Sequence, residues 1–118
     1  MHEQADRFRA VLLAELDDLV QDLRDAEDLY RARYTRGDVS GYVLLENTAV
    51  LEHEIAGIAA VAAALRAADL PRGVPTGSLC GWFATLCRAT IEEKRFPEGI
   101  AGLLARKCSK VLRYLNEP

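Results

Sequence analysis

The sequence predicts an all-α fold, in which two long helices form an antiparallel hairpin and two shorter helices pack against it in a four-helix-bundle-like arrangement. Apolar residues recur every three or four positions through almost every long segment, as they do on one face of a helix. None of these segments alternates apolar and polar residues in the manner of a strand. The 118 residues also match the usual length of one domain. We therefore expect residues 1–118 to form a single helical domain.

The first helix is expected over residues 4–36, where the apolar pattern is longest. Arginines at its C-terminal end oppose the negative end of the helix dipole. Gly37 follows them and suits the left-handed position that ends many helices. The inward positions of this helix are Phe8, Leu12, Leu16, Leu19, Leu23, Ala26, Tyr30 and Tyr34.

The second helix is expected over residues 39–70, with Asp38 or Ser40 as its N-terminal cap. Because the joint between the two long helices is short, they must fold back on each other as an antiparallel hairpin. The inward positions of the second helix are Leu44, Asn47, Leu51, Ile55, Ile58, Ala62 and Leu65.

Two shorter helices are expected over residues 78–94 and 97–116, after a Pro- and Gly-rich break at residues 71–77. Pro97 is suited to the first turn of the last helix. These helices are about half as long as the first two, so they cannot cover the whole hairpin. Part of its apolar face is therefore left for a partner.

The second helix also contains an uncharged run, Ile55–Leu65, which is too short by itself to span a bilayer. A helix that is apolar all round is normally surrounded by its own domain or by a second copy. Small residues on its far side allow another helix to approach closely, which suits a homodimer. The alternative is that alanine serves here only as the best helix former. The predicted interface comprises Ala56, Ala59, Ala60, Ala63, Ala64 and Ala67.

Asn47 is the one polar residue on the inward stripe of the second helix. A buried amide must be hydrogen-bonded, and such a residue often fixes helix register or partner choice. We therefore expect Asn47 to be a polar core residue, with a satisfied structural role as the simpler alternative and a ligand contact as another.

Charge is distributed unevenly: residues 1–70 carry a net charge of −7 and residues 71–118 a net charge of +4. The last helix presents a basic face of Arg106, Lys110 and Arg113, which makes a nucleic-acid-associated protein an alternative function. The pI of about 5.4 argues against it, because nucleic-acid-binding domains are usually strongly basic. An acidic stripe on the first helix could instead dock this basic face or a basic partner; the stripe comprises Glu15, Asp18, Asp22 and Asp25.

The sequence offers little for catalysis or cofactor binding. It has two histidines, no phosphate-binding glycine loop and no Glu-x-x-His or His-x-x-x-His spacing for a metal. Three cysteines without a CxxC pair favour buried reduced thiols over a disulfide framework or a zinc site. We therefore expect no catalytic residues, no cofactor and no metal, and a metal- or small-molecule-binding bundle remains an alternative.

The function that the sequence favours is a small helical interaction or assembly module, non-enzymatic, which forms a homodimer and recognises a protein partner. The N-terminus has neither the basic segment nor the following apolar stretch of a secretory signal. The expected location is accordingly the cytoplasm, without membrane insertion.

Overall fold

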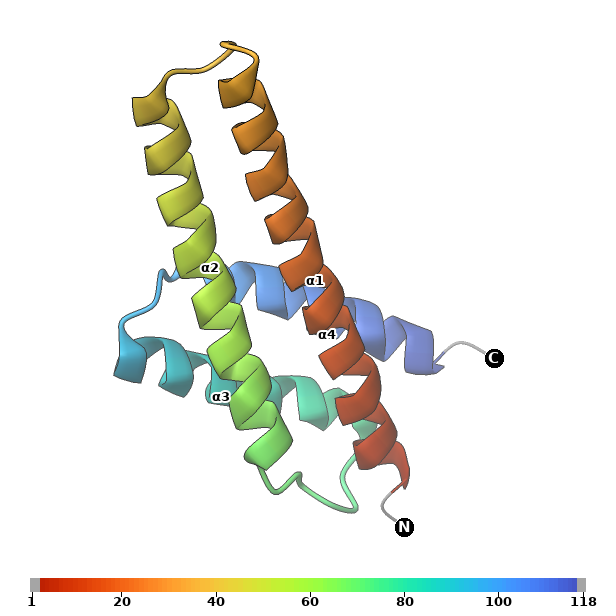
Figure 1. Cartoon of the computed structure of the whole chain (residues 1–118). Coiled ribbons are helices and arrows are strands. Elements are labelled where there is room, and N and C mark those ends of the chain that lie inside the picture. The colour runs from red at the N-terminus through yellow and green to blue at the C-terminus, as the bar shows by residue number, and fades with distance from the viewer. Residues whose placement is uncertain (1–2, 117–118) are drawn as a thin grey trace.

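The computed structural model describes residues 3–116, which contain four helices and no strand: α1 (Glu3–Thr35), α2 (Gly41–Ala67), α3 (Thr76–Lys94) and α4 (Gly99–Asn116). The two long helices α1 and α2 run antiparallel and make the most extensive helix–helix contact in the molecule (Figure 1). The prediction of an all-α fold, with a long hairpin and two shorter helices, is confirmed.

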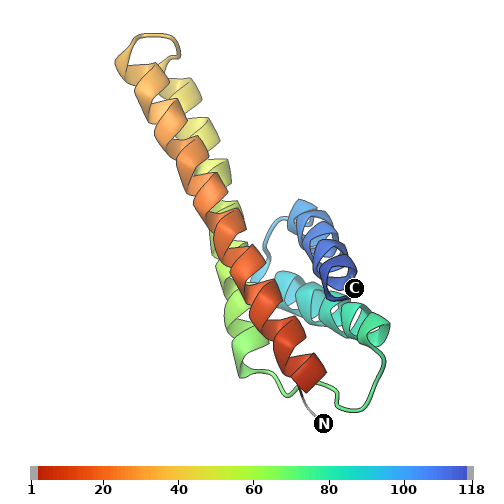
Figure 2. The same ribbon diagram turned by 90° about the vertical axis from the view of Figure 1, so that its right-hand side faces the viewer.

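The short helices pack together on one side of the hairpin and cross its lower half, so that its upper half projects beyond them (Figure 2). The molecule is accordingly elongated, with dimensions of 56 × 34 × 19 Å. We call residues 3–19 and 55–116 the base and residues 20–54 the distal arm.

The hydrophobic core lies in the base, where all four helices contribute to one cluster. Side chains of α1 and α2 pack on those of α3 and α4, because the three-to-four spacing turns each apolar stripe toward the others. The fully buried large side chains are Phe8, Leu12, Leu16, Ile58, Val61, Leu65, Leu79, Phe83, Ile100, Leu104 and Val111.

The turn at the tip of the hairpin forms as the sequence predicts. Gly37 has a φ of 81°, and the next amide, of Asp38, donates to the Arg33 carbonyl at 2.9 Å, which closes the end of α1. Ser40 caps α2 by accepting a hydrogen bond from the Val43 amide at 3.1 Å. The other candidate cap, Asp38, instead pairs with Arg36 at 3.2 Å.

Four helix boundaries differ from the prediction by two residues or more. The second helix begins at Gly41 and not at residue 39, because Ser40 is its N-terminal cap. The second helix ends at Ala67 and not at residue 70. Pro71 explains why residue 70 is not helical, because proline disfavours helical backbone at the residue before it. Residue 68 is already extended, and its carbonyl accepts a hydrogen bond from Arg9 Nη1 at 2.9 Å. Helix α3 starts at Thr76, two residues early. Helix α4 starts at Gly99. Pro97 lies just before it, and its carbonyl accepts a hydrogen bond from the Ile100 amide at 3.2 Å in the turn that opens the helix.

The turn between α3 and α4 depends on a left-handed residue that is not glycine. Arg95 has a φ of 56°, and the following amide, of Phe96, donates to the Ile91 carbonyl at 3.0 Å. This turn directs the Phe96 ring against Gly57 of α2. A methyl group at Gly57 would collide with the Ile100 side chain, so glycine here allows α4 to approach α2 closely.

Candidate functional site

The distal arm is the part of the hairpin that α3 and α4 leave uncovered. Of residues 20–54, Glu27 is the only one that is buried. The apolar stripes of the core continue into the arm at the same helical spacing, but their members there are only half-buried: Leu23, Ala26, Tyr30, Leu44 and Leu51. Two helices alone therefore cannot shield the apolar face that four helices shield in the base.

Large exposed apolar side chains are concentrated in the same region. Five of the six in residues 3–116 lie between residues 29 and 50, and the sixth is Tyr114 of α4. The two most exposed are Tyr42, at 76%, and Leu45, at 71%, both in the first two turns of α2. The others in the arm are Leu29, Tyr34 and Val50.

The alanines that the sequence marked as an interface lie on the same side of α2 as these two residues. Spacings of three, four and seven residues join them into one row, which we call the outer face of α2, and the exposed Glu52 and His53 occupy the turn between Ala49 and Ala56. All its members are exposed except Ala60, which is half-buried. The predicted interface residues Ala59, exposed, and Ala64, half-buried, lie beside this row. The row comprises Tyr42, Leu45, Ala49, Ala56, Ala60, Ala63 and Ala67.

Asn47 is not a core residue, contrary to the prediction. It lies in the distal arm, where only α1 packs on α2, and is therefore half-buried. Its Nδ2 atom donates to the Val43 carbonyl of its own helix at 2.8 Å. Because this bond is made within α2, it fixes no contact between helices.

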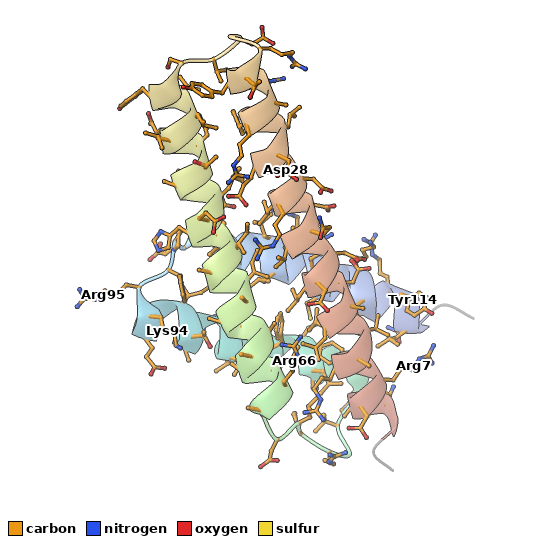
Figure 3. All side chains as sticks on the ribbon, viewed as in Figure 1. Arg7, Asp28, Arg66, Lys94, Arg95 and Tyr114 are labelled. Carbon is orange, nitrogen blue, oxygen red and sulfur yellow. The ribbon has the colours of Figure 1, made fainter. Side chains whose placement is uncertain are left out.

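The basic face of α4 is partly occupied by the acidic stripe of α1. Glu15 Oε2 lies 3.2 Å from Lys110 Nζ and 3.7 Å from Lys107 Nζ. The other two members of the predicted basic face, Arg106 and Arg113, are exposed. A cation–π contact adds to this junction, with Arg7 placed 6.0 Å from the centre of the Tyr114 ring (Figure 3).

Glu27, the buried acid of the arm, faces Glu52 across the hairpin. Hydrogen bonding with the Glu52 carboxyl group raises the pKa of Glu27, and burial and the charge of Glu52 raise it further. Arg31 and Arg24 act in the opposite direction. Glu27 Oε2 accepts no hydrogen bond, and its nearest cation is Arg31 Nη2 at 3.6 Å. The sequence analysis missed this site, although Glu27 follows Val20 and Leu23 at helical spacing.

Small-molecule and metal sites find little support in the described part of the chain. No group of three or more His, Cys, Asp and Glu side chains in residues 3–116 has the geometry of a metal site. His53 is exposed, and its ring packs edge-on against Phe96 at 5.8 Å. A shallow, mainly apolar groove of about 350 Å³ lies between α1 and α4. Its lining residues are Ala10, Val11, Ala14, Glu15, Lys110, Val111 and Tyr114.

Helix α2 is long and apolar enough to cross a membrane when length and composition alone are considered. Its most apolar stretch has a mean hydropathy of 1.5, and 33% of that stretch is buried inside the molecule. This is weak evidence, because the core helix of a water-soluble protein meets the same criterion.

Comparison with known proteins yields no relative: no family model matches the sequence, and the chain matches neither a curated protein nor a solved structure.

Proposed function

We propose that this protein is a helical assembly module that forms a homodimer through the outer face of α2. The observation that carries the proposal is a largely apolar, exposed row that runs from Tyr42 to Ala67, almost the full length of the helix, with Glu52 and His53 in the one turn that it skips. Exposed apolar patches of this extent commonly mark interaction sites on proteins. An interaction module fits this surface better than an enzyme does, because all the side chains of the row apart from the Tyr42 phenol are aliphatic.

The distribution of side-chain size along the outer face favours a second copy of the chain as the occupant. Tyr42 and Leu45 stand at the N-terminal end of the row, whereas Ala60, Ala63 and Ala67 stand at the C-terminal end. In a two-fold symmetric pair with antiparallel α2 helices, the large end of each helix meets the small end of the other. Large side chains then pack over small ones, which allows close helix approach.

This dimer also covers the outer side of the distal arm, where Tyr42 and Leu45 are exposed, but not the side that α3 and α4 leave open. In a single chain the distal arm has two helices, and a second copy of α2 against it adds a third. Burial of Tyr42 and Leu45 would stabilise the pair by about 1.5–3 kcal/mol for each side chain that becomes fully buried. The module then recognises further proteins, or organises them, as a symmetric pair.

Solution mass by light scattering behind a sizing column tests the proposal. The wild-type protein is expected at twice the 13.0 kDa mass of the chain. Leu45→Glu and Ala60→Glu place a charge at opposite ends of the outer face, so each should yield a folded monomer with unchanged helical circular dichroism.

The matched control is Val50→Glu. Val50 is also an apolar residue of α2, and its side chain is 56% exposed. It is five residues from Leu45 and therefore lies on another side of the helix. This variant should remain dimeric. A wild-type monomer at every concentration, or dissociation by Val50→Glu alone, would contradict the proposal. A dimer that forms only after addition of detergent or lipid would instead indicate a membrane role for α2.

A further inference from the structure

Cys80 of α3 and Cys108 of α4 bring their sulfur atoms into direct contact inside the base. The two Sγ atoms are 2.7 Å apart, compared with ~2.05 Å in a disulfide bond. Cys80 Sγ also lies 3.7 Å from the carbonyl oxygen of Cys108, so its side chain points at this residue of the neighbouring helix. Both cysteines are reduced in the structure.

We propose that Cys80 and Cys108 are a thiol pair that a low-molecular-weight disulfide converts to an intramolecular disulfide, which links α3 to α4. The geometry requires little movement, because the sulfur atoms already face each other across two packed helices. The proposal concerns the base and is independent of the dimer seam on α2.

The disulfide forms in two steps, and the exposure of each cysteine determines which one reacts first. Cys80 is half-buried and is the accessible thiol, whereas Cys108 is buried. Burial, followed by hydrogen bonding with Cys80, raises the pKa of Cys108, which disfavours its attack on a reagent in solution. Cys80 thiolate therefore attacks the small disulfide first. This forms a mixed disulfide and releases one equivalent of the small thiol.

Cys108 completes the reaction. Its sulfur loses a proton and attacks the Cys80 sulfur of the mixed disulfide, and the second small thiol leaves. In total, two protein thiols are oxidised to one disulfide and the small disulfide is reduced to two thiols. The reverse exchange restores the reduced pair, so that the link is reversible.

Cys87 provides an internal control. It lies two turns from Cys80 on the same helix and is buried. Burial raises the pKa of its thiol to about 12. No sulfur contact joins Cys87 to either of the other cysteines in the described part of the chain. It should therefore stay reduced.

Treatment of the folded protein with oxidised glutathione, followed by intact-mass measurement and non-reducing peptide mapping, tests the proposal. The wild type should lose the mass of two hydrogens and yield one cross-linked peptide that contains Cys80 and Cys108. Cys87→Ala should react in the same way. Cys108→Ser should instead stop at the mixed disulfide, with one glutathione on Cys80. The melting temperature of the oxidised wild type should rise by ~10 °C, because the link closes a long loop in the unfolded chain.

Three results would overturn the proposal: wild type that does not react, wild type that retains glutathione on Cys80, or a cross-link that involves Cys87. Peptide mapping of the wild type identifies the linked cysteines directly, so it tests the proposal even where a variant does not fold.

Discussion

The base and the distal arm share the same two long helices but differ in what covers them. In the base, Leu12 of α1 and Ile58 of α2 are fully buried beneath α3 and α4. In the arm, residues at equivalent positions on the same stripes, such as Leu23 and Leu51, are half-buried. The amphipathic pattern therefore continues from the base into the arm, but the burial of its apolar residues does not. Apolar stripes on two long helices are not enough to form a stable core, which also requires the side chains of α3 and α4.

Truncation of apolar residues should show this difference with the largest effect. Leu104→Ala, in the base, removes a fully buried side chain and should lower the free energy of unfolding by ~2–5 kcal/mol. Leu45→Ala, in the arm, removes a side chain that is 71% exposed in the single chain. In monomeric protein it should change stability by less than ~0.5 kcal/mol. Urea denaturation of both variants, at concentrations where each is monomeric, measures the two values. Equal losses would show that the arm is as well packed as the base.

Glycine replacement sharpens the comparison within the base. Gly57→Ala should destabilise by ~1–3 kcal/mol, because the added methyl group must displace Ile100 and Phe96. Gly81→Ala is the control, since a methyl group there meets nothing within 4 Å on an exposed face of α3. It should stabilise by up to ~1 kcal/mol through helix propensity. Thermal melts of both proteins test the pair. A harmless Gly57→Ala would mean that α4 is not held against α2.

Replacement of Glu27, the buried acid in the arm, should change the free energy of unfolding by only ~1 kcal/mol. Unlike the truncations above, it should raise the free energy of unfolding at neutral pH. The pKa of Glu27 in the folded protein lies above its ordinary value of 4.5. The stability that this group contributes is therefore fully present below pH 4.5 and is lost as the pH rises through the folded-state pKa. Glu27→Gln abolishes that loss, so the variant should gain stability relative to wild type as the pH rises from 4 to 7.

Urea denaturation at a series of pH values measures this gain. The control is Glu52→Gln, which removes the main cause of the raised pKa while leaving Glu27 in place. A Glu27→Gln protein that is less stable than wild type at pH 7 would contradict the account. It would show that the ion pair with Arg31, at 3.6 Å, outweighs burial and the proximity of Glu52.

Much of the fold could be predicted from the sequence because it depends on local signals. Helical spacing defined the inward faces, and Gly37 and Ser40 marked the turn between α1 and α2. The direction in which α3 and α4 cross the hairpin could not be predicted, since a periodic stripe shows which face is buried but not the angle between helices. For the same reason Asn47 was expected in the core, although no short helix reaches it.

The candidate site was only partly predictable. Alanines on α2 are visible as a small-residue row in the sequence, but Tyr42 and Leu45 become part of that row only when the uncovered arm is known. Contact between Cys80 and Cys108 was missed, because 28 residues and a helix–helix register separate them. Features within one helix were accessible to pattern analysis, whereas features between helices required the structure.

Hydrogen exchange measured at low and high protein concentration tests the central claim, that the distal arm depends on a partner and the base does not. Backbone amides of the base should exchange slowly at both concentrations, because their protection comes from the four-helix core. Amides of residues 42–54 should exchange rapidly in dilute protein and more slowly in concentrated protein, as a second copy covers α2. Equal and concentration-independent protection of the arm and the base would contradict the account.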